Sequence, residues 1–242
     1  MLTSKINPQE FTELYNNALP FAHINFLNLF DEDKLKEIVK EFPTMEREMS
    51  DKSGRTTNQK QSFKTKHGEI LKRLQPKTKE FCKFMNSDVM VKWLRDLTGI
   101  KDLVADDTLE GGGPHTISKG GFLKMHVDFN VHPKTRYDRR LNVLVYLNDK
   151  WDKNWGGDLE LWKDMKEDTF KRTYGPVMNN TIIFNTTDVS WHGHPDPLNC
   201  PEHIKRRSLA FYYYTKPKVE SEAHNTIYVE RPGEKFKRWI YY

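Results

Sequence analysis

The stretch GGFLKMHVDFN, residues 120–130, alternates apolar and polar side chains with the period of a half-buried β-strand. One face carries Leu123, Met125, Val127 and Phe129, and the other carries Lys124, His126, Asp128 and Asn130. If the polar face meets water, the histidine and the aspartate are ordinary solvated side chains. If that face lines the inside of a β-barrel, both side chains point the same way from a rigid strand, which suits two ligands of one metal ion.

The chain after residue 103 contains several more short runs of strand-forming residues, separated by clusters of Gly, Pro, Asn and Asp. Many short strands at this spacing are typical of a sandwich, a barrel or a jelly roll. The runs are PHTIS (114–118), FLKMHVDF (122–129), RLNVLVYLN (140–148), DLELW (158–162), NTIIFNT (180–186) and RRSLAFYYYT (206–215).

The first hundred residues have helical patterns instead. DEDKLKEIVKEFP, residues 31–43, has apolar residues at helical spacing and an acidic first turn, and we expect Pro43 to end this helix. A second helix is expected over residues 77–86. A third should run from an N-cap at Ser87 to Gly99.

The boundary between the helical and strand regions carries no linker signal, so we expect one domain spanning residues 1–242. It is mainly β with N-terminal helices. Residues 1–102 form a mostly helical support, and residues 103–242 form the β core with a C-terminal extension. Within the support, residues 50–69 are polar and basic with little to bury, and we expect a mobile loop there.

Composition excludes several classes of protein. The 242 residues carry a formal net charge of +5, but basic and acidic residues are interspersed, and no dense basic run with aromatics indicates a nucleic-acid partner. Cys82 and Cys200 lie far apart without CxxC spacing, which argues against a disulfide scaffold or a thiolate zinc site. No stretch has the length of a membrane span and the N-terminus has no hydrophobic signal core, so we expect a cytoplasmic protein.

A third metal ligand can come from FNTTDVSWHGHPDPL, residues 184–198, which offers His192 and His194. Two histidines and one carboxylate form the facial triad of non-haem Fe(II) oxygenases, although a zinc hydrolase could use the same ligands. The next strand, residues 206–215, begins with two arginines. An enzyme that grips the distal carboxylate of a keto-acid needs such a residue, whereas a hydrolase has no general need for it.

In this order, HVDFN, RRLNVLVYLN, GGDLELW, NTIIFNTTDVSWHGHP and RRSLAFYYYT resemble the 2-oxoglutarate and Fe(II)-dependent oxygenases, and within them the prolyl 4-hydroxylase-like branch. The resemblance covers residues 103–215 and extends to PFAHINFLNLF (20–30) and HNTIYVERPGE (224–234). It implies a double-stranded β-helix core, of the jelly roll or cupin-like kind. This core has two four-stranded sheets with the iron at the open end.

The resemblance also implies a metal site and cosubstrates. His126, Asp128 and His192 would hold Fe(II), while 2-oxoglutarate and O2 occupy the remaining positions. His192 is expected rather than His194 because the family motif places the ligand before a small residue and a proline, as in WHGHP. Ascorbate is a further candidate cofactor.

For the distal carboxylate of 2-oxoglutarate, Arg206 is expected rather than Arg207. Arg206 shares a strand face with small residues that leave room for a cosubstrate, and the family motif agrees with this choice. The resemblance makes Tyr146 a hydroxyl donor to the same carboxylate, with a purely structural tyrosine as the alternative. Asn142 is a weaker candidate on the same face of its strand.

The predicted activity is hydroxylation of an unactivated C–H bond with release of succinate and CO2, and a prolyl residue in a peptide or protein is the expected substrate. The alternatives are a free amino acid or other small molecule, or a catalytically silent metal-binding barrel. Nucleic-acid dealkylation fits less well, because the RRS pair lacks the longer arginine spacing of that branch. The loop at residues 50–69 is expected to act as a lid over the active-site mouth.

Overall fold

The computed structural model describes residues 1–3, 6–48, 70–167, 169–217, 219 and 221–233. The expected mobile loop and lid at residues 50–69 lie outside the described residues. Within the described ranges, no helix is both long and apolar enough to cross a membrane.

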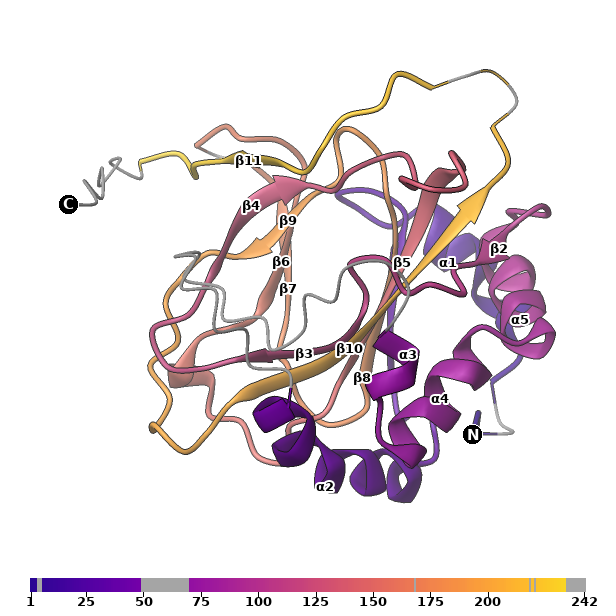
Figure 1. Ribbon diagram of the computed structural model, residues 1–242. Helices are drawn as coiled ribbons and strands as arrows, with labels where there is room; N and C mark the ends of the chain where they lie inside the picture. The colour runs from indigo at the N-terminus through magenta and orange to yellow at the C-terminus, as the bar shows by residue number, and fades with distance from the viewer. Residues whose placement is uncertain (4–5, 49–69, 168, 218, 220, 234–242) are drawn as a thin grey trace.

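Two antiparallel sheets face each other and form the body of the molecule (Figure 1). The larger sheet has six strands in the order β1-β8-β5-β10-β2, with β3 also paired to β10. Its strands are β1 (His23–Leu27), β2 (Val104–Ala105), β3 (Gly113–Ile117), β5 (Asp138–Tyr146), β8 (Asn180–Asn185) and β10 (Arg206–Thr215). The smaller sheet, in the order β11-β4-β9-β6-β7, contains β4 (Leu123–Val127), β6 (Leu159–Trp162), β7 (Lys171–Tyr174), β9 (Trp191–His194) and β11 (Ile227–Val229).

The two sheets are wider than the expected four strands each. Strands β1 and β2 extend the edges of the larger sheet, and β11 extends an edge of the smaller one. Without these additions, four strands remain in each sheet, as expected. Strand β1 also lies in the region where helices were expected, and β9 adds a strand after β8 that the sequence patterns do not indicate.

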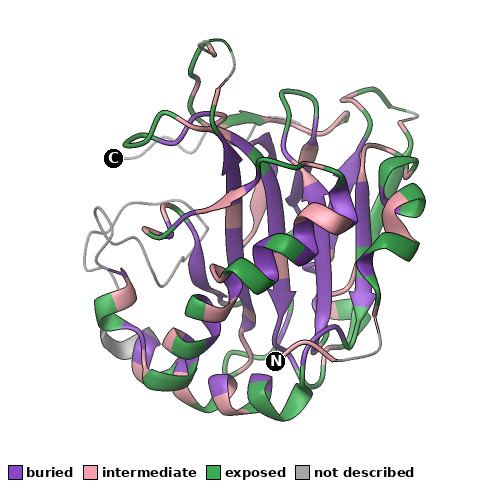
Figure 2. Ribbon diagram, turned by 90° about the vertical axis from the view of Figure 1, so that its right-hand side faces the viewer, coloured by how far each residue is buried: buried purple, intermediate pink, exposed green. Residues whose placement is uncertain are grey.

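Helices pack against the outer face of the larger sheet, so that face is buried rather than solvated (Figure 2). Leu141, Val143, Val145, Leu209 and Phe211 of the sheet contribute to this core. The helices are η1 (Pro8–Phe11), α1 (Thr12–Asn16), α2 (Glu32–Glu48), α3 (Ile70–Arg73), α4 (Pro76–Met85) and α5 (Asp88–Thr98), and a further 3-10 turn, η2, spans Lys153–Trp155. The predictions of a mainly β fold and of helices near residues 77–86 and 88–98 are confirmed.

The caps of α5 agree with the sequence. The Ser87 side chain accepts a hydrogen bond from the backbone N–H of Met90, and Gly99 follows the helix with a φ of 75°. A positive φ favours glycine because it has no Cβ.

Pro43 does not end α2, which continues to Glu48. Proline removes one backbone hydrogen bond and would normally kink or end a helix. Here Phe42 and Met45, on either side of the proline, are fully buried in the core beneath the helix. Burial of these apolar side chains offsets the missing hydrogen bond, which the local sequence rule does not consider.

A second, smaller core lies between the two sheets. Tyr146, Ile182 and Phe184 from the larger sheet meet Leu159 and Leu161 from β6. In β5, the side chains of Leu141, Val143 and Val145 thus face the helices, and that of Tyr146 faces the space between the sheets, as the alternation of the strand predicts.

Candidate metal centre

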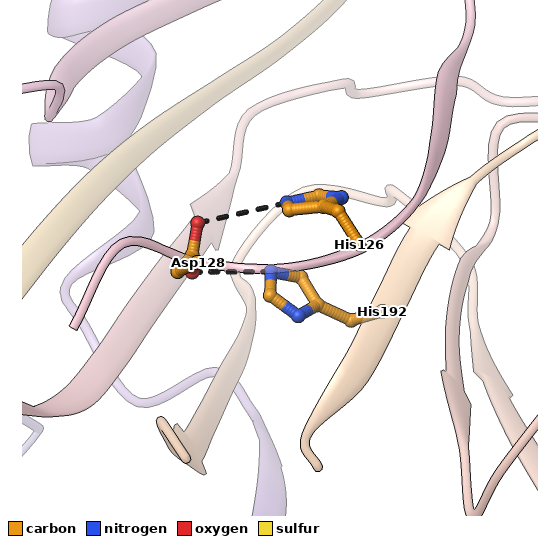
Figure 3. Close-up of side chains that lie close together, drawn as sticks. All are labelled: His126, Asp128 and His192. Carbon is orange, nitrogen blue, oxygen red and sulfur yellow. Dashed lines mark ion pairs between the residues drawn. The ribbon is translucent and has the colours of Figure 1, made fainter. Parts of the chain in front are cut away.

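Three side chains converge at one end of the space between the sheets (Figure 3). His126 lies on β4, Asp128 follows the end of that strand, and His192 lies on the neighbouring strand β9. His126 and His192 are direct partners in the β4–β9 pairing. One ligand atom from each of the three residues lies within 4.8 Å of the others, so the geometry is suitable for holding a single ion.

Gly193 allows the two histidine-bearing strands to approach. A Cβ at this position would lie 2.8 Å from the carbonyl oxygens of both Leu123 and Lys124 on β4. Those atoms belong to the backbone, so any larger residue would force β9 away from β4. The glycine between the two histidines of WHGHP therefore has a packing role that brings His192 to His126.

Backbone carbonyls orient both histidine rings. Nδ1 of His126 lies 2.8 Å from the carbonyl oxygen of Lys124, and Nδ1 of His192 lies 2.9 Å from that of Ser190. A carbonyl can only accept, so in each case Nδ1 carries the proton. In the neutral rings, Nε2 then presents a lone pair, at 3.6 Å (His126) and 3.3 Å (His192) from the Asp128 carboxylate oxygens. Lone pairs facing a carboxylate at these distances are a fitting set of ligands for a cation.

Two side chains of β5 hold the Asp128 carboxylate from behind. Its Oδ2 accepts hydrogen bonds from Nη2 of Arg139 at 2.9 Å and from Nδ2 of Asn142 at 2.8 Å. Oδ1 receives no such bond from these two residues. Asn142, a predicted cosubstrate ligand, thus directs its amide N–H to the aspartate, and its Oδ1 accepts from Nε of Arg139 at 3.0 Å.

The charges around the cluster favour metal-binding protonation states. Burial alone would raise the pKa of Asp128, but the Arg139 guanidinium and the neighbouring histidines hold it well below its ordinary value, so the carboxylate is ionised. Burial, together with His192, lowers the pKa of His126 and favours its neutral, ligating form.

Arg139 was not among the residues singled out by sequence. Strict alternation from Leu141 would place it on the helix side of β5. The register between β5 and β10 shifts at Tyr213/Tyr214, where Leu141 pairs with Tyr213 but Arg139 pairs with Tyr214. This β-bulge turns Arg139 inward, where its guanidinium lies over the rings of Phe129 and Tyr212, 4.5 and 3.5 Å from their centroids.

A second polar group lies deeper between the sheets. Nη2 of the buried Arg206 donates a hydrogen bond to the Tyr146 hydroxyl at 3.0 Å, and its Nε donates to the carbonyl of Gly157 at 2.7 Å. Arg207 instead faces the helices, 5.5 Å from the centroid of the Phe42 ring. The strand faces expected for the two arginines are therefore those of the structure.

Gly157 leaves the space that Arg206 occupies. It has a φ of +81°, and a Cβ there would lie 3.1 Å from Cδ of Arg206 and 2.6 Å from Cδ2 of Leu198. Gly157 lies just before β6, and its carbonyl accepts the hydrogen bond that fixes Nε of Arg206.

His194 lies on the same strand as His192, two residues on, and only 3% of its surface is exposed. Neither of its ring nitrogens has a hydrogen-bond partner among the described residues. Burial lowers its pKa well below the ordinary value, and the nearby charge of Arg206 adds to the effect. It does not belong to the three-residue ligand cluster.

A cavity of about 350 Å³ adjoins the cluster on the side of Asp128 and Arg139. All of its lining residues are polar or charged. Three further carboxylates line it, those of Asp138, Asp188 and Glu222, and the remaining residues are asparagine, threonine and serine.

Comparison with known proteins agrees with this geometry. The sequence profile of the 2OG-Fe(II) oxygenase superfamily matches residues 113–214, which include all three clustered residues and Arg206. The fold is that of the 2OG-Fe(II) oxygenases. The resemblance seen in the sequence, and the double-stranded β-helix that it implies, are confirmed. No curated protein is significantly similar in sequence.

Several solved structures share this oxygenase fold at low sequence identity. A Pseudomonas putida prolyl-4-hydroxylase superposes with a TM-score of 0.60 at 14% identity, covering 87% of this chain and 100% of that one. A Trichoplax adhaerens prolyl hydroxylase, solved in complex with a hypoxia inducible factor peptide, has a TM-score of 0.58 at 13% identity, covering 86% and 89%. HygX from Streptomyces hygroscopicus, solved with nickel, 2-oxoglutarate and hygromycin B, has a TM-score of 0.54 at 12% identity, covering 88% and 89%.

Proposed function

We propose that the protein is a 2-oxoglutarate- and Fe(II)-dependent dioxygenase that hydroxylates an unactivated C–H bond. The observation that carries this proposal is the pair of buried histidines whose Nδ1 atoms are bonded to carbonyls while their Nε2 atoms face the partly buried Asp128 carboxylate. His126, Asp128 and His192 would hold Fe(II), because two imidazoles and one carboxylate form the set that leaves positions open for cosubstrate and O2. Bound Fe(II) and 2-oxoglutarate supply the oxidising chemistry, with succinate and CO2 as products.

Arg206 and Tyr146 fit the distal carboxylate of 2-oxoglutarate. Burial raises the pKa of the Tyr146 hydroxyl, so it stays protonated despite the opposing charge of Arg206. It accepts a hydrogen bond from Arg206 and keeps its own proton to donate. A cation and a hydroxyl donor in a buried site would bind and orient a carboxylate. Asn142 would act on the metal side, by orienting Asp128.

For the substrate, a prolyl residue of a peptide or protein is supported by the prolyl hydroxylases among the similar structures. The polar cavity beside Asp128 favours a second candidate, a free amino acid or other small polar molecule. An amine or hydroxyl group could pair with Asp138, whose Oδ1 has no hydrogen-bond partner among the described residues, and with the exposed carboxylates of Asp188 and Glu222. HygX, which was solved with hygromycin B, has the same fold.

The test begins with turnover in the absence of an added substrate. The protein, loaded anaerobically with Fe(II) and 2-oxoglutarate and then exposed to air, should form succinate, and an Asp128→Asn variant should not. The same samples are then given prolyl peptides, free amino acids and polyamines, with and without ascorbate, and products are examined by mass spectrometry for the gain of one oxygen atom. Absence of succinate in every sample would favour the silent metal-binding barrel.

Matched variants at the cavity separate the two substrate candidates. If a prolyl peptide is the substrate, neutralising Asp138 and Glu222 as Asp138→Asn and Glu222→Gln should change turnover little. If a cationic small molecule is the substrate, the same changes should raise its KM and leave succinate formation without substrate intact. Cytoplasmic location stays a prediction from the sequence.

A further inference from the structure

His194 is a buried side chain that the proposed metal centre does not use. Its ring is polar on two sides, yet neither Nδ1 nor Nε2 has a hydrogen-bond partner among the described residues. Leaving buried polar atoms unpaired costs free energy, and such groups in a folded protein indicate a missing partner. Packing alone does not require a histidine at this position, because a leucine would fill the same space without leaving buried polar atoms unpaired.

The position of His194 indicates which partner is missing. Residues 192 and 194 lie on the same face of β9, so the His194 ring points into the space between the sheets beside His192. In the β4–β9 pairing it lies opposite Leu123, whereas His192 lies opposite His126. It is thus displaced from the metal cluster toward the start of β6, because Gly193 pairs with Glu160 and the Gly157 carbonyl that binds Arg206 lies three residues before Glu160.

We propose that His194 donates a hydrogen bond to the distal carboxylate of bound 2-oxoglutarate, as a third donor beside Arg206 and Tyr146. This inference rests on the proposed function. Two N–H groups of Arg206 already donate hydrogen bonds within the protein, one from Nε to the Gly157 carbonyl and one from Nη2 to the Tyr146 hydroxyl. A carboxylate has about four lone-pair sites, of which a guanidinium can fill at most two and the Tyr146 hydroxyl one, so there is room for a third donor. A neutral imidazole N–H supplies one without adding a charge.

The experiment measures binding rather than turnover. Anaerobic calorimetry gives the Kd of 2-oxoglutarate for the Fe(II)-loaded wild-type protein and for its His194→Leu and His194→Gln variants. Leucine is similar in size to histidine but cannot donate a hydrogen bond, whereas glutamine keeps an N–H donor. The same titrations use 2-oxopentanoate, which has a methyl group in place of the distal carboxylate. His23→Leu is the control, since His23 is also a buried histidine but bonds Tyr174 at 2.6 Å, at the β1 edge of the larger sheet.

We expect His194→Leu to weaken 2-oxoglutarate about tenfold or more, as the loss of a hydrogen bond to a charged group does. It should leave the affinity for 2-oxopentanoate and for Fe(II) unchanged. His194→Gln should recover most of the loss, and His23→Leu should show none. If the wild-type protein does not bind 2-oxoglutarate at all, the proposed function itself fails.

Other results would overturn the role of His194 while the proposed function stands. These are a wild-type-like Kd for His194→Leu, an equal loss for both oxo-acids, or a loss of Fe(II). A second measurement covers the case in which the leucine variant does not fold. This measurement follows the ring N–H proton of His194 by NMR in the Zn(II)-loaded wild-type protein, where the signal is assigned by its absence in His194→Gln. The signal should shift and become protected from exchange with water when 2-oxoglutarate is added, but not when 2-oxopentanoate is added. An unshifted proton would contradict the proposal.

Discussion

Nη2 of Arg139 donates a hydrogen bond to Oδ2 of Asp128 at 2.9 Å, from a side chain that is only 1% exposed. The rings of Phe129 and Tyr212 lie against the guanidinium, and Asn142 accepts from it on the same side as the aspartate. The arginine is therefore fixed before any ion binds. It presents the carboxylate in one orientation, with Oδ1 turned toward His126.

Replacing Arg139 by glutamine should weaken Fe(II) binding about 10- to 100-fold, because side chains that orient metal ligands typically contribute this much. Competition with a coloured Fe(II) chelator under anaerobic conditions measures the affinity. Arg140→Gln is the matched control. Arg140 is the neighbouring residue in the bulge, but it is exposed and its Nη1 lies 3.5 Å from Thr215 instead of near the cluster. An equal loss in both variants would contradict the orienting role.

This arginine also shows where sequence patterns stop being sufficient. A period of two places Tyr146 and Arg206 inside correctly, because both lie on strands whose register is regular there. Arg139 lies beyond a β-bulge, and one extra residue reverses the face of everything that follows. The bulge depends on pairing with β10, which lies far along the chain, so no local pattern contains it.

The same distinction applies to the fold. Strands β4, β5, β8 and β10 have clear alternation or apolar runs, and they could be predicted. Strand β9 is short and contains glycine, and Trp191 is its only residue that favours a strand, so its sequence predicts a strand only weakly. It is held by pairing with β4 and β6, which only the tertiary structure provides.

His192→Ala should lower Fe(II) affinity by more than the loss of an orienting residue does, whereas His194→Ala should retain Fe(II). The reason is that Nε2 of His192 faces the Asp128 carboxylate at 3.3 Å, while His194 lies outside the ligand cluster. Both histidines are buried and share a strand, so they serve as each other's control. Iron content after anaerobic loading and gel filtration would decide. Loss of iron in His194→Ala alone would exchange the two assignments.

The metal-free protein should lose stability as the pH falls from about 6.5 toward about 4. His115 lies on β3 with Nε2 at 3.2 Å from the Gly111 carbonyl, and burial, with Arg206, lowers its pKa to about 4 against an ordinary 6.5. Between these values the unfolded chain binds a proton that the folded chain does not, so the free energy of unfolding decreases as the pH drops. Asp128 acts in a lower window, below its ordinary pKa of 3.8, because its folded pKa is held down.

Urea unfolding of the chelator-treated protein between pH 7 and pH 4 tests this dependence. Other histidines with lowered pKa values, such as the buried His23, contribute to the same slope. The diagnostic quantity is therefore the difference between the wild-type protein and His115→Gln, which should show a shallower slope. Parallel curves for the two proteins would mean that His115 is not held neutral by the fold.

Arg206→Ala should weaken the binding of 2-oxoglutarate about 10- to 100-fold, while Arg207→Ala should change it little. The two residues are adjacent, but β10 turns Arg206 to Tyr146 and Gly157 between the sheets and Arg207 to Phe42 beneath helix α2. A charged hydrogen bond to a carboxylate contributes about 1.5 to 3 kcal/mol, which sets the expected range. Anaerobic titration of the Fe(II)-loaded variants gives both dissociation constants. A large loss of 2-oxoglutarate affinity confined to Arg207→Ala would show that the cosubstrate binds on the helix side of the sheet.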